Sequence, residues 1–483
     1  MNLKNFFKEK GYDITEKEQW DSNIAIWKSW YKGKVSKFHN YYVYNGQKKV
    51  KREKKSLQAA KKVCEDWADL LLNEKVQISL KDQTATDTLL KILKDNNFEE
   101  IGNQGVELAF ALSIGMFVVS IDNMLESDNI IDVSDAKTKI EFVQADKIYP
   151  LSWENGNITE CAFVIKKTEK GKNYIYISLH LLNEQGNYII ENHKFESTKN
   201  NDIGIEIEDD SIMREFDTKN NIPWFAALKP NSCNNIDTDT IYGISIFANS
   251  IDVLKALDNA YNECDNEVVL GRRRTFISEE MMDYSSGDAQ LTFDAEDISV
   301  YRMPKGFSKD SMFHSSSEQL RTSDYEKAVQ FNLNMLSNNV GFGQERYKFD
   351  NGNISTATGV ISENSDMYRR VKKHEIVLDN TLKKLFKAVI YATNTFTSEK
   401  ISSDGEDIQI LYDDSIIEDK GAEQVKAQTE MGLGVRSKND YMKNIRGLGD
   451  DQIKEELEQI AIERQEAQQS ILDDNSDEEK LEE

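Results

Sequence analysis

Apolar residues recur at helical spacing in several stretches of the chain. Residues 13–31 are the first example, because Trp20, Ile24, Trp27 and Tyr31 lie three or four positions apart. A second helix is expected after Ser56, a residue type that favours the N-cap position. From Ser355 to Thr393 the helical pattern continues, so a rod of roughly 60 Å is expected at about 1.5 Å per residue. Further helices are predicted over residues 86–97, 98–112, 247–270 and 320–340.

Between Ile140 and about Phe216 the apolar period changes to two, which is typical of strands. Gly156, Gly171 and Gly186 fall in the intervening turns, so we expect a mostly antiparallel sheet there. Shorter strand patterns cover residues 38–44, 76–80 and 116–121. Helices precede and follow the sheet, so the predicted class is α+β rather than doubly wound α/β.

The stretch from Tyr242 to Thr393 has an unusual order. Two predicted helices flank an insert over 275–317 that reads as short strands, including 291–293 and 298–301, and turns. We expect Gly271 to end the first helix as a left-handed cap. A polar loop, Gly343–Gly352, then leads into the long helix, where Gly359 is a plausible kink. Two helices with a small β insert at their far end would form an arm.

Composition bounds the class of protein. The chain has 483 residues, too many for one ordinary core, so two to four modules are expected. No run of about 18 apolar residues exists, and the N-terminus lacks the apolar core of a signal peptide. We therefore expect no membrane span and a protein that stays inside the cell that makes it. The four cysteines are far apart, and those on predicted helices, Cys64 and Cys264, are expected to be reduced, buried thiols.

The net charge of the chain argues against tight, non-specific DNA binding. The formal net charge is −25, whereas tight non-specific DNA binding needs basic groups that release counterions. Two basic runs stand out against this background. Residues 48–55 form either a solvated loop or hairpin, or a contact with an acidic partner or nucleic acid. Arg272, Arg273 and Arg274 follow a predicted helix, where its dipole alone would favour cations.

Motifs for chemistry are mostly absent from the sequence. There is no G-x-x-x-x-G-K-[ST] loop, no G-x-G-x-x-G, no H-E-x-x-H and no G-x-S-x-G. The five histidines show no metal-ligand spacing, and the many acidic residues give no specific sign of a nuclease site. We expect no enzyme activity, no cofactor and no metal.

The order and spacing of several segments resemble the portal proteins of tailed bacteriophages. The resemblance spans nearly the whole chain and contains no short catalytic signature. The segments that carry it are Trp30–Gly33, Tyr41–Gly46, Lys61–Glu74, Tyr242–Phe247 and Ser355–Ser365.

The resemblance implies a portal fold with an α/β wing, a two-helix stem, a small α/β clip, a long kinked helix and a helical crown. The implied boundaries are 1–240 for the wing, 241–271 and 318–340 for the stem helices, 272–317 for the clip, 341–354 for a tunnel loop, 355–415 for the long wing helix and a return strand, 416–472 for the crown and 473–483 for an acidic tail. The tail is expected to be disordered or loosely ordered.

The resemblance also implies a function. A homo-oligomeric ring, usually dodecameric, would sit at one capsid vertex of the virion, join head to tail, seed shell assembly and conduct double-stranded DNA during packaging and ejection. It would be made in the host cytoplasm. Its partners would be the terminase motor, the major capsid protein and neck or adaptor proteins, with no membrane. The alternatives are a neck, tail or baseplate protein without a DNA channel, and a nucleic-acid enzyme.

Candidate contact residues follow from these positions. Arg346 and Lys348 in the tunnel loop would touch DNA transiently, with Tyr347 as an apolar contact. The alternative is an exposed loop without DNA contact, since Glu345 and Asp350 bring the loop close to neutral. In the clip, Arg272, Arg273 and Arg274 would contact neighbouring subunits or docked proteins.

Overall fold

The computed structural model forms two compact units. The first holds residues 1–354 and 364–413, and the second holds residues 355–363 and 414–483. The structure describes residues 2–44, 48–123, 125–127, 130–133, 135–197, 203–209, 213–271, 274–278, 300–303, 313–316, 319–343, 346–347, 357–412, 420–444, 453–454 and 456–460.

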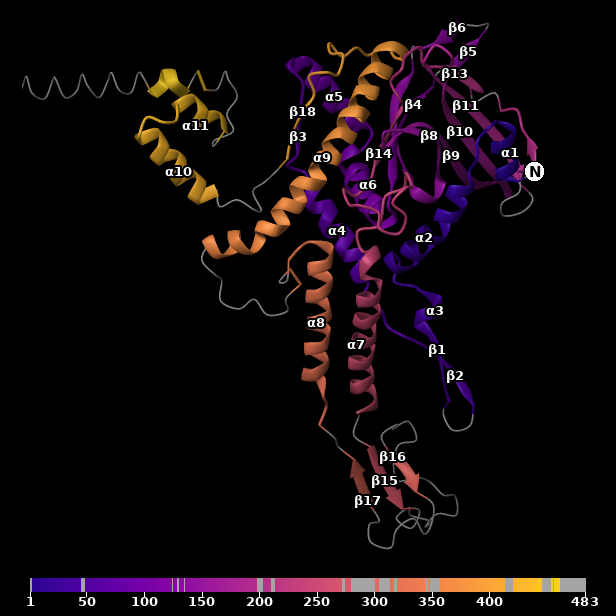
Figure 1. The fold of residues 1–483 in the computed structure, drawn as a ribbon, viewed down its shortest axis with the longest axis vertical. Helices are drawn as coiled ribbons and strands as arrows, with labels where there is room; N and C mark the ends of the chain where they lie inside the picture. The colour runs from indigo at the N-terminus through magenta and orange to yellow at the C-terminus, as the bar shows by residue number, and fades with distance from the viewer. Residues whose placement is uncertain are drawn as a thin grey trace, which may run out of the picture. The chain divides into compact units, whose positions relative to one another are not determined.

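Helices and strands are segregated along the first unit, so the predicted α+β class is confirmed (Figure 1). The predicted helix over 98–112 has those bounds in the structure. It packs with its N-terminal neighbours because each carries an apolar stripe. The helix itself is α6 (Phe98–Leu112), and its helical partners are α2 (Thr15–Tyr31), α4 (Ala59–Leu71) and α5 (Gln83–Asp95). The first helix, α1 (Leu3–Glu9), packs on the sheet described below.

The N-cap prediction at Ser56 is wrong, because α4 begins at Ala59 after Gln58, whose φ is 55°. The Ser56 hydroxyl instead accepts a hydrogen bond from the Gln58 backbone N–H at 3.1 Å. The Leu57 N–H donates to Asp258 of α7 (Ile251–Leu270) at 2.9 Å. These contacts hold residues 56–58 outside the helix, so a tertiary contact outweighs the local capping preference.

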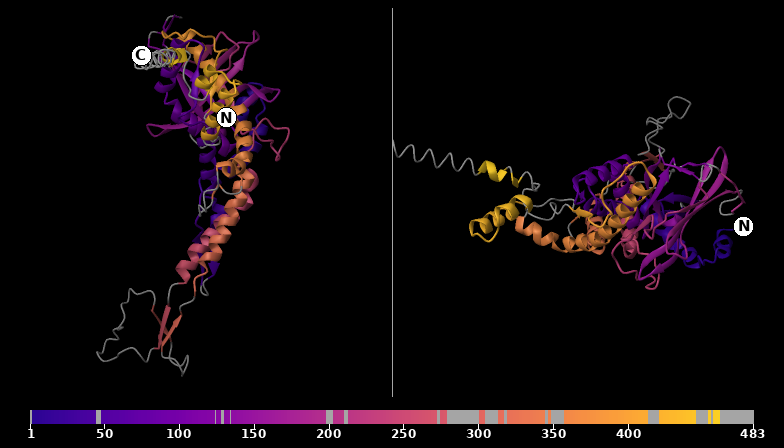
Figure 2. Two further views of the ribbon diagram at one scale, coloured as in Figure 1. Left: turned by 90° about the vertical axis from the view of Figure 1, so that its left-hand side faces the viewer. Right: turned by 90° about the horizontal axis from the view of Figure 1, so that it is seen from above.

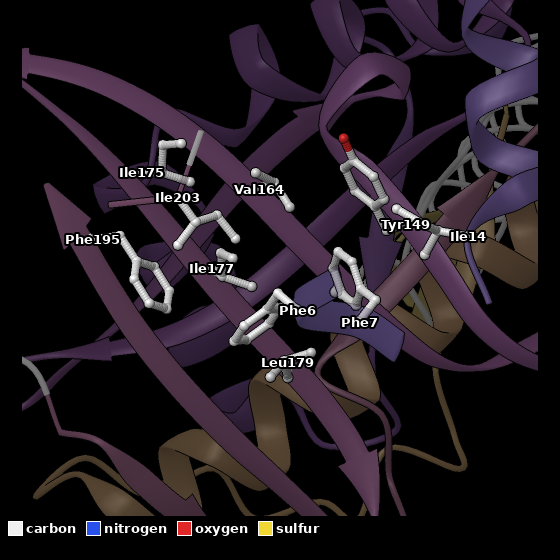
Figure 3. Close-up of a cluster of buried hydrophobic side chains, with 11 residues drawn as sticks. Phe6, Phe7, Ile14, Tyr149, Val164, Ile175, Ile177, Leu179, Phe195 and Ile203 are labelled. Atoms are coloured by element: carbon white, nitrogen blue, oxygen red, sulfur yellow. The ribbon is translucent and has the colours of Figure 1, made fainter. Parts of the chain in front are cut away.

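An antiparallel sheet dominates the middle of the first unit, as the period-two pattern predicts. Phe6 and Phe7 of α1 pack into the core on one of its faces, and the Phe7 ring stacks on Tyr149 with centroids 5.4 Å apart (Figure 3). The strand order is β12-β11-β10-β9-β8, with β13 also pairing with β11. The bounds are β8 (Ile148–Glu154), β9 (Asn157–Glu169), β10 (Lys172–Leu182), β11 (Tyr188–Ser197), β12 (Ile205–Glu206) and β13 (Glu215–Asp217).

Smaller sheets complete the first unit. One has the order β14-β4-β7, and its strand β4 covers the predicted buried strand over 116–121. Two others pair β18 with β3 and β5 with β6. The bounds are β3 (Gln77–Ser79), β4 (Gly115–Asp122), β5 (Leu125–Ser127), β6 (Ile130–Asp132), β7 (Lys137–Gln144), β14 (Phe225–Leu228) and β18 (Gln409–Leu411), with 3-10 turns η1 (Ala145–Lys147) and η2 (Ala248–Ser250).

The predicted pair of helices is present as α7 and α8 (Thr322–Val340), which lie side by side (Figures 1 and 2). Between them in sequence are β15 (Arg274–Ser278), β16 (Val300–Met303) and β17 (Phe313–Ser316), in the order β16-β15-β17. The predicted strand over 291–293 lies outside the described residues.

Gly271 does not form the predicted left-handed cap, since its φ is −78°. A Cβ at this position would lie 2.2 Å from Leu320 Cδ2 and 2.7 Å from the Glu267 carbonyl oxygen. The glycine is therefore required for space, where the chain entering α8 crosses the end of α7. Arg321 fixes this crossing through two hydrogen bonds to the Glu267 carboxylate, at 3.1 and 2.9 Å.

The long helix predicted after Ser355 is α9 (Ala357–Phe396), which has 40 residues. It runs through Gly359, and a kink there stays a prediction. The described helices near the C-terminus, in the second unit, are α10 (Lys420–Gly432) and α11 (Lys438–Asn444). The acidic tail over 473–483 lies outside the described residues.

His180, on β10, is fully buried between the rings of Phe163 and Phe225. Its Nδ1 has no hydrogen-bond partner among the described residues. Burial lowers the pKa of His180 from 6.5 to about 3. Below pH 6.5 the His180 imidazole is protonated in the unfolded chain, whereas in the folded chain it stays neutral until about pH 3. Lowering the pH between these two values therefore destabilises the fold.

We expect a His180→Phe variant to lose this pH dependence. Between pH 6.5 and 5.5 the wild-type free energy of unfolding should fall by about 1 kcal/mol more than that of the variant, since one pH unit corresponds to about 1.4 kcal/mol per proton. Urea unfolding at several pH values measures how steeply the free energy of unfolding changes with pH in each protein. Comparing these two slopes removes any pH-independent cost of fitting the phenylalanine ring. Equal slopes in the two proteins would contradict the prediction.

Candidate functional site

The loop between α8 and α9 begins at a left-handed backbone position that glycine occupies without strain. Gly341 has φ +100° and caps α8, and its N–H donates to Ser337 and Asn338 carbonyl oxygens. A side chain there would be strained by φ and would also meet Arg370. We call Gly341–Gly343, Arg346 and Tyr347 the loop foot; residues 344–345 and 348–356 lie outside the described residues.

Trp67 of α4 holds the start of the loop foot. Its indole N–H donates to the Val340 carbonyl oxygen at 3.3 Å, and its ring stacks on Phe342 at a centroid distance of 4.7 Å. His374 of α9 approaches the same indole edge-on at 4.8 Å. Trp67 is 0% exposed. One tryptophan therefore joins α4, the end of α8 and α9 around the loop foot.

Asp66, the preceding residue of α4, holds the end of the loop foot. The Tyr347 hydroxyl donates to Asp66 Oδ2 at 2.8 Å, and the Gln330 side-chain amide donates to the Tyr347 carbonyl oxygen at 3.1 Å. Lys62 forms an ion pair with the other Asp66 oxygen at 2.9 Å, and the Arg346 guanidinium lies 3.8 Å from it. Burial and the Asp66 charge raise the pKa of Tyr347, so the phenol stays a donor.

The structure places two of the three predicted loop residues. Arg346 is exposed, with its guanidinium 5.8 Å from the Phe342 ring centre. Tyr347 is half-buried, and its ring meets Phe342 edge-on at 6.1 Å. Lys348 lies outside the described residues. That these residues face DNA stays a prediction, but within the chain Tyr347 already has a structural partner.

Sequence reasoning missed Asp66 and Trp67 as partners of the loop. Both lie in the helix expected after Ser56, and neither carried a signal for a contact with the loop. Their contacts with the loop span 273 to 281 residues of sequence, so no local spacing connects the two segments.

The clip arginines are only partly described. Arg274 begins β15, where its Cα pairs with that of Ser316, and Arg272 and Arg273 lie outside the described residues. Their docking role stays a prediction.

The described residues show few features of a chemical site. No three His, Cys, Asp or Glu side chains among them gather closely enough to hold a metal ion. Where the structure places helices, none is both long and apolar enough to cross a bilayer. Cys64 is buried and Cys264 half-buried, and both are free thiols.

The fold and the loop foot define a mixed helix-and-sheet protein whose long helices meet at an anchored loop. A family model described as "Phage portal protein, SPP1 Gp6-like" matches residues 11–470. The chain belongs to this family of phage portal proteins, as its sequence resemblance predicted.

Two further comparisons add little to the family assignment. None of the curated proteins matches the chain. One similar solved structure is described as "Neck of native GTA particle computed with C12 symmetry". It shares 9% identity over 80% of this chain and 89% of the other, with a TM-score of 0.40.

Proposed function

We propose that this chain is the subunit of a portal ring that sits at one capsid vertex, joins head to tail and conducts double-stranded DNA in both directions. The observation that carries the proposal is the family match over residues 11–470. The ring would be dodecameric. Its partners would be the terminase motor, which supplies the work, the major capsid protein and neck or adaptor proteins.

The division of the chain follows the same proposal. Residues 1–240 would be the wing, α7 and α8 the stem helices within 241–271 and 318–340, and residues 272–317 the clip. Residues 341–354 would be the tunnel loop, 355–415 the long helix with its return strand, and 416–472 the crown, followed by the acidic tail over 473–483.

The loop foot supports a specific arrangement in the channel. Asp66 and Trp67 would fix both ends of the foot to α4, so that Arg346, which is exposed, is presented to the DNA together with Lys348. Tyr347 would act mainly as an anchor. With a net charge of −25 on each chain, an acidic channel wall would keep the phosphate backbone from adhering.

Electron microscopy of the purified protein tests the proposal. A portal should form rings with an axial hole wide enough for duplex DNA, which is roughly 20 Å across. Closed discs, rods or a permanent monomer would favour the alternative of a neck, tail or baseplate protein without a channel. A plasmid-cleavage assay with divalent metal tests the remaining alternative, a nuclease.

The clip arginines give a separate prediction. A variant with Arg272, Arg273 and Arg274 changed to Glu should fold and form rings, but bind motor or neck proteins at least about tenfold more weakly, since carboxylates would replace the guanidinium groups proposed to make the contact. Pull-down with the partner proteins measures this. The matched control reverses three exposed lysines elsewhere, Lys81, Lys94 and Lys137. Normal docking by the arginine variant would refute the assignment.

A further inference from the structure

The basic run over 48–55 belongs to a hairpin that carries exposed aromatic side chains. β1 (Asn40–Tyr44) pairs with β2 (Lys49–Glu53) as an isolated two-stranded sheet after the short helix α3 (Ser36–His39). Tyr42 lies opposite Lys51, and Tyr44 opposite Lys49. Because directly opposed residues point to the same face, this face presents two tyrosines and two lysines. Tyr42 is 68% and Tyr44 65% exposed.

The base of the hairpin is fastened to α7. His39 and Asp258, both buried, are joined by a 2.9 Å hydrogen bond, and His39 Nδ1 accepts the Val35 N–H at 2.9 Å. Lys54 donates to the Asn259 side chain at 2.8 Å, and Lys55 pairs with Asp265 at 2.6 Å. A two-stranded hairpin is marginally stable alone. These contacts hold it as an arm with its aromatic face in solvent.

A second exposed apolar surface lies on α8. Phe331 is 64% and Met335 41% exposed, whereas the buried positions of the helix are Val329, Leu333, Leu336, Ser337 and Val340. Phe331 and Met335 are four residues apart and share one face of the helix. Figure 1 shows α8 and the hairpin flanking α7 from different sides. Two exposed apolar surfaces on different sides of one unit suit a head-to-tail contact, in which unlike faces of neighbouring copies meet.

Charge favours a second copy of this chain as the occupant. The run Lys48–Lys55 holds six basic residues and one glutamate, whereas α8 holds two carboxylates, Asp324 and Glu326, and one lysine. Asp324 and Glu326, near the start of α8, are exposed. Opposite charge on the two surfaces adds attraction and selects the pairing.

We propose that the β1–β2 hairpin of one copy docks its Tyr42, Tyr44, Lys49 and Lys51 face on the Phe331 and Met335 face of α8 in the next copy. This proposal rests on the proposed ring. In this proposal the basic run over 48–55 contacts a neighbouring copy of the chain. Contact of the same run with DNA is the alternative that the test below distinguishes.

Cysteine cross-linking tests the contact in the full-length ring. The background is Cys233→Ser, which removes an exposed native thiol. A chain carrying both Tyr42→Cys and Phe331→Cys should give a ladder of covalent multimers after mild oxidation, because each copy links to two neighbours. Either single variant should give monomer only. The matched control pairs Tyr42→Cys with Ile376→Cys, a residue of α9 that is 61% exposed, and should give no ladder.

A charge-reversal variant separates the outcomes. Lys49→Glu with Lys51→Glu should lower the ring fraction about tenfold at a concentration where wild type is half assembled, because carboxylates would then face carboxylates. Lys81→Glu with Lys94→Glu, which makes the same charge change elsewhere, should assemble normally.

If wild type forms rings but the double-cysteine chain gives no ladder, the proposed contact is wrong while the proposed ring is retained. If the wild-type protein forms no ring, the proposed portal function is refuted, and with it the hairpin contact that depends on the ring. Normal rings with weakened DNA retention in the hairpin variant would assign the hairpin to DNA instead.

Discussion

Replacing Trp67 with alanine is expected to lower the free energy of unfolding by about 3–5 kcal/mol, the usual cost of truncating a buried aromatic residue. Trp67 is fully buried, stacks on Phe342 and meets His374 edge-on. Denaturant unfolding measures the loss. The loop foot should also open, so trypsin should cleave after Arg346 faster under native conditions.

Trp67→Phe is the matched control. It keeps an aromatic ring between Phe342 and His374 but loses the indole hydrogen bond to the Val340 carbonyl oxygen. The free energy of unfolding should fall less in Trp67→Phe than in Trp67→Ala, because phenylalanine preserves most of the apolar contact. If Trp67→Ala cost under 1 kcal/mol, or if both variants cost the same, the aromatic stack would not be what holds the loop foot.

Replacing Asp66 with alanine is expected to cost about 1–3 kcal/mol, because the half-buried Tyr347 hydroxyl loses its acceptor. Lys62 contributes little to this figure, since its side chain is 56% exposed and exposed ion pairs are weak. Tyr347→Phe removes the same hydrogen bond from the other side. The double variant should therefore cost less than the sum of the two single variants, which a double-mutant cycle measures.

Trypsin cleavage after Arg346 provides a local measure of the same contact. If the hydrogen bond holds the foot closed, losing about 1.4 kcal/mol of closing free energy should speed cleavage about tenfold in either single variant. Cleavage after Lys170, in the exposed turn between β9 and β10, serves as the internal control and should not change. Strict additivity, with unchanged cleavage after Arg346, would contradict the anchoring role of Asp66.

Strongly periodic elements could be predicted closely from the sequence. Residues 98–112 form α6 with the predicted bounds, and the period-two stretch after Ile140 is the antiparallel sheet with glycines in its turns. Local rules failed where a distant segment intervened. Ser56 is not the N-cap because the Leu57 N–H donates to Asp258 of α7. Gly271 is required because a Cβ there would crowd the Glu267 carbonyl oxygen and Leu320, and not because of its own φ.

The sequence by itself determined the α+β class, the succession of long helices around a polar loop and, through the order of its segments, membership of the portal family. These depend on side-chain periodicity and turn residues, which are local properties. Only the tertiary structure decided what anchors the loop, because Asp66 contacts Tyr347 across 281 residues of sequence and Trp67 contacts Phe342 across a similar separation. It also decided which face of the hairpin and of α8 remains in solvent, because burial depends on neighbours that no local pattern specifies.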